Sequence, residues 1–414
     1  MKAPVVDALR LQRQIDELAA ISEAPPPVVT RILFSEADLQ GRGFIKKIAT
    51  ELGLAWRQDA VGNMFARWEG TEPKLPPIAT GSHIDAIPNA GRYDGVVGVL
   101  GALEAIRALK ESGFKPKHSI ELILFTAEEP TRFGIGCLGS RLLSGTLPAA
   151  QAEGLRDREG NSLAHWRTKG GLQDQDLTSV RLNKGHYAAF IELHIEQGPL
   201  LEKENIPIGV VEKIAAPSSI RVEVRGIGGH AGALLMPDRH DALLAGAEIA
   251  LAVERAALKS GSPDTVATTG VFRIEPGAVN SVPCRAWLEI DLRDTQVTTR
   301  DAALKQIEDS VRQICNRRDV GFRIERVNVD APAICDAKLV HTVSRVCGEL
   351  GLPVKKMISR AYHDSLFMAQ ICPTTMIFIP CRGGVSHRPD EYSSPEQIRD
   401  GVRVLAQTLA NLAA

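Results

Sequence analysis

Two adjacent glutamates, Glu128 and Glu129, carry the clearest chemical signal in the sequence. They follow the apolar run 122–125, which is typical of a buried strand, and Pro130 ends the segment. Neighbouring carboxylates repel one another, which raises a pKa unless a cation neutralises the charge. One carboxylate could bind a divalent metal while the other acts as general base on water. An isolated pair is more often two solvated loop residues, so the interpretation depends on the rest of the chain.

Histidines and further acids close other apolar runs of the chain. His83 and Asp85 end one such run, and Asp94 follows within a glycine-rich turn. Two more histidines, His194 and His387, come with later apolar segments. Imidazoles together with several carboxylates suit borderline divalent ions such as Zn²⁺, Mn²⁺ or Co²⁺.

Each of these residues alone is a weak signal, because a lone histidine at a strand end is more often structural. An aspartate among glycines is likewise common in turns. So many such groups at strand ends nevertheless favour a metal site. Asp94 could bridge two ions about 3.5–4 Å apart, the usual spacing in dinuclear hydrolases. Asp85 could accept the second N–H of His83 and so fix its tautomer.

The composition is that of an ordinary globular protein. Of 414 residues, 44% are hydrophobic and 24% are charged, and the formal net charge is -1. This charge gives no indication of a nucleic-acid or acidic-membrane partner. The seven cysteines include no C-x-x-C pair, which favours reduced thiols in a cytoplasmic enzyme. No apolar run is long enough to span a bilayer, and the first residues lack a signal-peptide core.

Strand-like and helix-like segments alternate along the chain, which predicts an α/β domain. The clearest of them are three strands and a helix, at 76–85, 119–126, 187–196 and 95–110. Between 215 and 330 the order becomes β-α-β-β-α-β, which predicts a ferredoxin-like domain. We therefore expect one domain formed by residues 1–214 and 331–414, with a second domain inserted at 215–330.

Several longer blocks of the sequence carry a family resemblance. They include GSHIDAIPNAGRYDGVVGVLGALEAI, LFTAEEPTRFGIGCLGSRLLSG, ELHIEQGPLLE, GGHAGALLMPDRHDAL and MIFIPCRGGVSHRPDEYSSPE. These blocks resemble the M20 metallopeptidase family, in its branch of ureido-hydrolysing amidases. The resemblance implies a mixed-sheet α/β dinuclear metallohydrolase domain. It also implies that the inserted ferredoxin-like domain serves as a lid and forms a homodimer.

The resemblance implies a role for each candidate residue. Two divalent ions per subunit, Mn²⁺ or Zn²⁺ with Co²⁺ or Ni²⁺ also possible, would be held by His83, Asp94, Glu129, His194 and His387. Glu128 would be the general base, and His230 would stabilise the oxyanion, in this family also in the site of the partner subunit. The substrate would be held by Gln197, Asn280, Arg293, Tyr362 and His363. A cis peptide bond between Asp94 and Gly95 is implied as well.

Two departures from the usual pattern of the branch bear on the substrate. Tyr362 stands where carbamoylases and allantoate amidohydrolases usually have a glycine, and Pro130 follows the glutamate pair. The added phenol would tighten the pocket and supply a donor. Both departures, with the block FIPCRGGVSH, look most like the ureidoglycolate-cleaving members of the branch. This resemblance implies the small ureido-carboxylate (S)-ureidoglycolate as substrate, with glyoxylate, ammonia and carbon dioxide as products of purine breakdown.

Other readings of the sequence are open. An N-carbamoyl-L-amino acid or allantoate is the alternative substrate within the branch. A dipeptidase or aminoacylase on the same fold is less favoured, because the block HIEQGP and the pair Asn280 and Arg293 look like the ureido-amidase branch. A non-catalytic binding protein is less favoured, because Glu128 stands beside a full set of candidate ligands.

Overall fold

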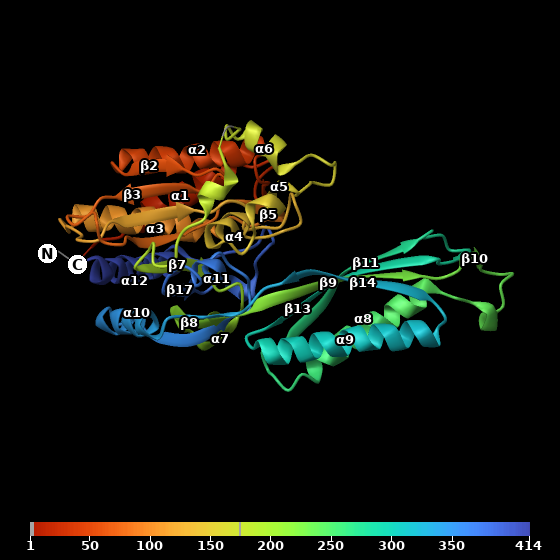
Figure 1. Ribbon diagram of the computed structural model, residues 1–414. Coiled ribbons are helices and arrows are strands. Elements are labelled where there is room, and N and C mark those ends of the chain that lie inside the picture. Colours follow the sequence, from red (N-terminus) through yellow and green to blue (C-terminus); the bar gives the residue numbers. More distant parts are fainter. Residues whose placement is uncertain (1–3, 174) are drawn as a thin grey trace. The chain divides into compact units, whose positions relative to one another are not determined.

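The computed structural model describes residues 4–173 and 175–414, which form two compact units (Figure 1). Unit 1 consists of the described residues up to Glu212, together with Ile334–Met357 and His363–Ala414. Unit 2 consists of Lys213–Ala333 and Ile358–Tyr362. The chain therefore leaves unit 1, builds unit 2 and returns.

Unit 1 is an α/β unit built around one large sheet. Its strands, of which β8 and β16 continue into unit 2, are β1 (Val29–Arg31), β2 (Ala55–Gln58), β3 (Met64–Trp68), β4 (Ile78–Ser82), β5 (Ala86–Ala90), β6 (Ile120–Leu124), β7 (Ala189–Ile195), β8 (Ile208–Ile214), β16 (Val354–Ser359) and β17 (Thr374–Ile379). Its helices are α1 (Ala8–Ala20), α2 (Glu36–Glu51), α3 (Val96–Glu111), α4 (Leu138–Ser144), α5 (Ala149–Glu153), α6 (Leu163–Lys169), α7 (Leu200–Glu204), α10 (Ala337–Glu349), α11 (Ser365–Met368) and α12 (Pro395–Ala413).

The central strands of the large sheet are parallel, and their direction determines at which edge of the sheet a functional site is expected. The strand order is β15-β8-β17-β7-β4-β6-β3-β2, where β15 is Ala333–Ile334 and β16 pairs with β8. Strands β17, β7, β4 and β6 are parallel neighbours, whereas β3 and β8 run antiparallel to them. Their carboxyl ends therefore meet at one edge of the sheet, where ligands bind in open α/β sheets.

The parallel strands are apolar because both faces of the sheet are covered. All five residues of β6 and all seven of β7 are buried. Helix α3 packs closely onto this centre through Gly98, where an added Cβ would lie 2.5 Å from the Leu193 carbonyl oxygen. The tight packing fixes the start of α3, and with it the turn that holds Asp94.

Unit 2 is a four-stranded antiparallel sheet with two helices. The sheet order is β11 (Val266–Glu275), β13 (Arg285–Asp294), β9 (Ala216–Arg225) and β14 (Gly321–Val329). Helices α8 (Ala242–Leu258) and α9 (Val297–Arg317) lie along one face of it (Figure 1). A two-stranded ribbon, β10 (Gly229–His230) with β12 (Ser281–Val282), completes the unit. The order β9-α8-β11-β13-α9-β14 is the predicted β-α-β-β-α-β arrangement.

Among the residues described, no helix combines the length and apolar character needed to cross a membrane. All seven cysteines lie in the described part of the chain, and each is a free thiol.

Candidate metal centre

The candidate metal residues gather at the carboxyl edge of the parallel strands. His83 follows the last residue of β4, and His194 is the second-last residue of β7. Glu129 lies in the turn after β6, and His387 lies in the loop after β17. Asp94 comes from the turn before α3, which packs against the same strands. The fold thus brings together all five residues that the sequence suggested as ligands.

Asp94 connects two groups of possible ligand atoms. Its Oδ1 lies 3.1 Å from His194 Nε2 and 3.8 Å from His83 Nε2. Its Oδ2 lies 3.1 Å from His387 Nε2, which is also 3.3 Å from Glu129 Oε1. In each group, His83–Asp94–His194 and Asp94–Glu129–His387, the ligand atoms lie within 4.8 Å of one another. One carboxylate oxygen faces each group, which is the arrangement a bridging ligand requires.

The two buried histidines, His83 and His194, each turn Nε2 toward the candidate metal site. His83 Nδ1 lies 3.0 Å from the Asp85 carbonyl oxygen, and His194 Nδ1 lies 2.8 Å from that of Ile195. A carbonyl can only accept, so each Nδ1 carries a hydrogen and each Nε2 is left to face the group of candidate ligands. His83 Nε2 is buried, and in the described part of the chain it has no hydrogen-bond partner. A buried lone pair of this kind beside a carboxylate fits a divalent metal ion.

Asp85 supports the site in another way than the sequence suggested. Its main-chain carbonyl, and not its carboxylate, makes the close contact with His83, since Oδ1 is 3.7 Å from Nδ1. The carboxylate instead accepts the main-chain N–H groups of Glu128 and Glu129, at 3.3 and 3.0 Å. The expectation for its side chain was therefore wrong, because the turn after β6 offers two donors nearer to it. Asp85 holds the glutamate pair in place.

Glu128 lies beside the first group without being part of it. Its Oε2 is 3.8 Å from His83 Nε2, and its Oε1 is 3.6 Å from the Sγ of Cys137. The residue is 7% exposed. Burial, and after it the charge of Glu129, raises the pKa of Glu128 well above its usual value. A carboxyl group with a raised pKa beside a candidate metal site has the property that a general base and acid needs.

The charges around Asp94 stabilise one another. Burial alone would raise the pKa of Asp94, but hydrogen bonds from His194 and His387 hold it well below the usual value. Burial opposes protonation of His194, yet its bond to Asp94 raises its pKa to about 9. Bonds to Asp94 and Glu129 raise the pKa of His387 to about 11. In the metal-free chain, protons on these imidazoles occupy the places that a cation would take.

Gly95 leaves the space that His83 needs. Its φ is +65°, and an added Cβ would lie 2.4 Å from His83 Nε2. The peptide bond before it is trans, because the cis bonds in the described chain are Pro26–Pro27 and Glu275–Pro276. The expected cis bond at Asp94–Gly95 is therefore wrong. The turn is made by the left-handed backbone of glycine.

Gln197 and His363 lie against the metal residues in unit 1. Gln197 Nε2 donates to Asp94 Oδ2 at 2.8 Å and lies 3.2 Å from Ser386 Oγ. The buried ring of His363 packs edge-on against that of His194, with centroids 4.5 Å apart. Both residues therefore contact the site, where Gln197 orients the shared aspartate.

The remaining candidates belong to unit 2. His230 and Asn280 lie on the same ribbon, since His230 pairs with Ser281, and both side chains are exposed. Gly232 N–H donates to His230 Nδ1 at 3.1 Å, which leaves Nε2 for other contacts. Arg293 is held in a two-point pair with Asp291, at 2.8 and 3.0 Å.

Tyr362 ends the short return of the chain through unit 2. Its hydroxyl donates to Asp330 Oδ2 at 3.3 Å, and this aspartate is buried. The phenol therefore has a partner within its own unit.

Two buried glutamates that the sequence reasoning missed also hold this site. Glu391 accepts the N–H groups of Tyr93 and Asp94 at 2.7 and 3.1 Å. Glu192 accepts from the hydroxyls of Ser82 and Ser365. The only sequence signal was position, since Glu391 follows His387 by four residues and Glu192 precedes His194 by two.

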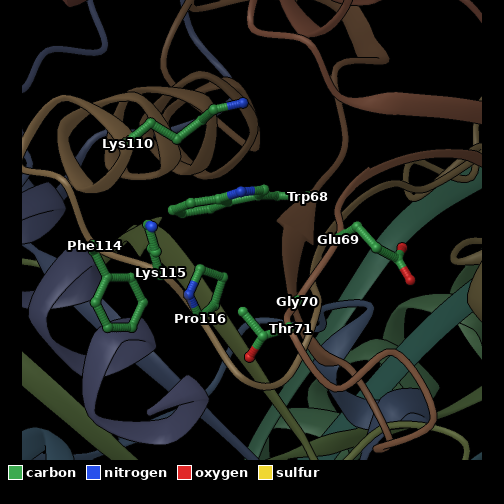
Figure 2. A pocket seen from close by; sticks show the side chains of 8 residues that line it. All are labelled: Trp68, Glu69, Gly70, Thr71, Lys110, Phe114, Lys115 and Pro116. Atoms are coloured by element: carbon green, nitrogen blue, oxygen red, sulfur yellow. The ribbon is translucent and has the colours of Figure 1, made fainter.

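A surface hollow elsewhere in unit 1 is distinct from this site. It has a volume of about 280 Å³, and Figure 2 shows the flat ring of Trp68 between the side chains of Lys110 and Pro116. Trp68 pairs with Ile120, the first residue of β6, whereas the glutamate pair follows the last one. The hollow therefore lies at the opposite edge of the sheet from the metal residues.

Residues 79–411 match the model of peptidase family M20/M25/M40. The chain belongs to this family. It is 55% identical over 413 residues to the ureidoglycolate hydrolase of Arabidopsis thaliana, covering 98% of this chain and 87% of that protein. It is 36% identical over 409 residues to the N-carbamoyl-L-amino acid amidohydrolase of Geobacillus stearothermophilus, covering 99% of both.

A solved structure agrees with this M20 assignment. The crystal structure of AtUAH in complex with glyoxylate matches the chain with a TM-score of 0.94 at 54% identity, and the match covers 99% of both chains. The family resemblance and the α/β fold class predicted from the sequence are thereby confirmed. The chain is a hydrolase of the M20 family whose described residues include groups suited to a metal ion.

Proposed function

We propose that this M20 hydrolase cleaves the ureido C–N bond of (S)-ureidoglycolate, with glyoxylate, ammonia and carbon dioxide as the final products. The observation that carries the proposal is the pair of ligand groups that share Asp94, with Glu128 beside them. The choice of substrate is supported by the 55% identity to a ureidoglycolate hydrolase. A solved relative that matches the whole chain was crystallised with glyoxylate, the proposed product.

The residues present fit two divalent ions. His83 and His194 would hold one ion, Glu129 and His387 would hold the other, and Asp94 would bridge them. When bound, the ions supply Lewis-acid polarisation of the ureido carbonyl and make hydroxide available near neutral pH. Imidazole and carboxylate ligands accept Mn²⁺, Zn²⁺, Co²⁺ and Ni²⁺ alike, and we expect Mn²⁺ or Zn²⁺.

The side chains of this chain would then move the protons. Glu128 takes a proton from the attacking water and later delivers it to the leaving nitrogen. Its burial and raised pKa suit both halves of that exchange. His230 stabilises the oxygen of the tetrahedral intermediate through Nε2, because Nδ1 already accepts the Gly232 N–H.

The substrate carboxylate would be bound by residues of unit 2. The planar guanidinium of Arg293 suits bidentate binding, and Asp291 already fixes its orientation. Asn280 would supply an amide donor next to His230. We also expect Gln197, Tyr362 and His363 to bind the substrate, with Tyr362 favouring a substrate that has a single ureido group.

We also infer that the chain forms a homodimer through unit 2. Leu244, Leu251 and Leu258 recur every seven residues along α8 and are 40%, 55% and 80% exposed. Phe272 and Val266, on the edge strand β11, are 39% and 42% exposed. An apolar stripe beside an edge strand fits a self-association surface. Leu251→Glu should convert dimers to monomers in light scattering, and a wild-type monomer would contradict this inference. A cytoplasmic location stays a prediction.

The proposed activity is tested by ammonia release from metal-loaded protein. Ureidoglycolate, allantoate and an N-carbamoyl-L-amino acid are compared in parallel, in Mn²⁺ and Zn²⁺ preparations. We expect turnover of ureidoglycolate well above that of the other two. Preference for allantoate or the N-carbamoyl-L-amino acid would support an amidohydrolase activity but contradict ureidoglycolate as the substrate. No turnover of any of the three compounds would contradict both the activity and the substrate.

A further inference from the structure

The loop that carries His387 is joined to the turn that carries Asp94 by one buried carboxylate. Glu391 is 4% exposed and lies between His387 and the start of α12. Its Oε1 accepts the main-chain N–H of Tyr93 at 2.7 Å and that of Asp94 at 3.1 Å. These donors are almost 300 residues away along the chain.

The second oxygen of Glu391 holds the other side of the junction. Its Oε2 lies 2.8 Å from Ser386 Oγ, and Ser386 directly precedes His387. The same hydroxyl lies 3.0 Å from Asp94 Oδ2 and 3.2 Å from Gln197 Nε2. The serine can thus donate its one hydrogen to either carboxylate while it accepts from Gln197.

The turn before α3 is shaped around this side chain. At Gly91 an added Cβ would lie 2.4 Å from the Glu391 Cβ and 2.6 Å from its Oε1. The main chain of the turn therefore passes directly over the glutamate. Such a fit leaves the carboxylate little freedom, so its two oxygens hold fixed positions on both segments.

We propose that Glu391 is a positioning residue that sets the spacing between Asp94 and His387, and thereby the affinity of the Asp94–Glu129–His387 group for its metal ion. Glu391 itself does not touch that ion in this account. Partners behind the ligands of metal sites commonly change metal affinity or activity by about 10–100-fold when they are lost. The inference rests on the proposed metal centre but not on the substrate.

The reach of the side chain, and not its charge, is the property that the proposal requires. Glu391→Gln keeps an oxygen for the two N–H donors, and its amide can donate to Ser386 Oγ. Glu391→Asp keeps the charge but is one methylene too short to span both segments. The matched control is Glu104→Asp, because Glu104 is a buried glutamate that bonds Asp7 N–H and Arg10, away from the metal residues.

The experiment measures Zn²⁺ affinity of the full chain by competition with a chromophoric chelator, without any substrate. We expect Glu391→Asp to weaken one of two Zn²⁺ equivalents by about 10–100-fold, and Glu391→Gln and Glu104→Asp to remain near the unsubstituted protein. Unchanged affinity in Glu391→Asp would overturn the proposal. An equal loss in Glu391→Gln would also overturn it, since charge would then be the cause.

A further variant covers the case in which Glu391→Asp does not fold. Ser386→Ala removes the link from Glu391 to Asp94 Oδ2 and leaves the bonds to the two N–H groups. It should weaken the same Zn²⁺ equivalent, and unchanged affinity there would overturn the proposal. Because the readout is metal binding, a failure of the ureidoglycolate assay would leave this result standing and be recognised separately.

Discussion

The carboxylate of Asp85 accepts the main-chain N–H of Glu129 at 3.0 Å and that of Glu128 at 3.3 Å. One buried side chain thus holds both halves of the glutamate pair, the expected metal ligand and the expected base. Its own main-chain carbonyl orients His83 at the same time. The end of β4 and the end of β6 are therefore positioned as one piece.

The first prediction concerns this anchor. Asp85→Asn replaces one accepting oxygen by an amide N–H group, which repels the N–H that it faces. We expect kcat to fall about 10–100-fold, as for other residues behind metal ligands. Asp157→Asn is the control, because Asp157 accepts main-chain N–H groups in an exposed loop at 159 and 161. Equal activities of the two variants would contradict the anchoring role.

A second prediction separates space from backbone strain at two glycines. Gly95 and Gly113 have φ of +65° and +80°, but an added Cβ meets His83 only at Gly95 and nothing within 4 Å at Gly113. Each alanine variant should lose about 1 kcal/mol of stability from the left-handed backbone. Only Gly95→Ala should also lose metal binding. Metal content after dialysis checks this, and a Gly95→Ala protein with a full complement would contradict it.

Part of the fold and of the candidate site could be predicted from the sequence, and part could not. The apolar runs of β6 and β7 and the long helix α3 were predictable, because burial on both faces leaves continuous apolar segments. Short strands such as β5 and β10 were not, since they depend on pairing with distant segments. The candidate ligands were recognisable because most of them close apolar runs. Glu391 was missed because Oε1 accepts only main-chain N–H groups, those of Tyr93 and Asp94, and such partners leave no mark in the sequence.

The acid–base properties of the ligands predict proton release on metal binding. The pKa of His387 is raised to about 11 by its bonds to Asp94 and Glu129, and that of His194 to about 9 by its bond to Asp94, against the effect of burial. Both imidazoles are therefore protonated at pH 7 without metal, and a cation must displace these protons. Titration calorimetry of metal binding in buffers of different ionisation enthalpy should show this proton release as a binding heat that changes with the buffer. A binding heat that is the same in all buffers would contradict the prediction.

The same shifts predict how the metal-free protein responds to pH. A raised folded-state pKa contributes stability that is complete below the unfolded value of about 6.5 and is lost as the pH rises toward 9 and beyond. Tm of the metal-free protein should therefore fall over that range. His387→Ala should flatten the fall, and an unchanged slope in that variant would argue against the assignment.

The thiols give a prediction that is independent of metal. Burial raises the pKa of Cys335, Cys347, Cys372 and Cys381 to about 12, whereas Cys284 is partly exposed. The thiolate is the reactive form. A thiol-disulfide reagent at pH 8 should modify one cysteine rapidly in the native protein and all seven in denaturant. Cys284→Ala should abolish the rapid phase, and a rapid phase that survives would contradict this arrangement.

The most direct test of the central claim compares two isosteric variants, Glu128→Gln and Glu129→Gln. Metal content and ammonia release from ureidoglycolate are measured on the same preparations. If Glu128 is the base and Glu129 a ligand, Glu128→Gln should keep both metal ions and lose activity by about 10²–10⁴-fold. Glu129→Gln should lose a metal ion together with activity. A Glu128→Gln protein that turns over at nearly the unsubstituted rate would contradict the account.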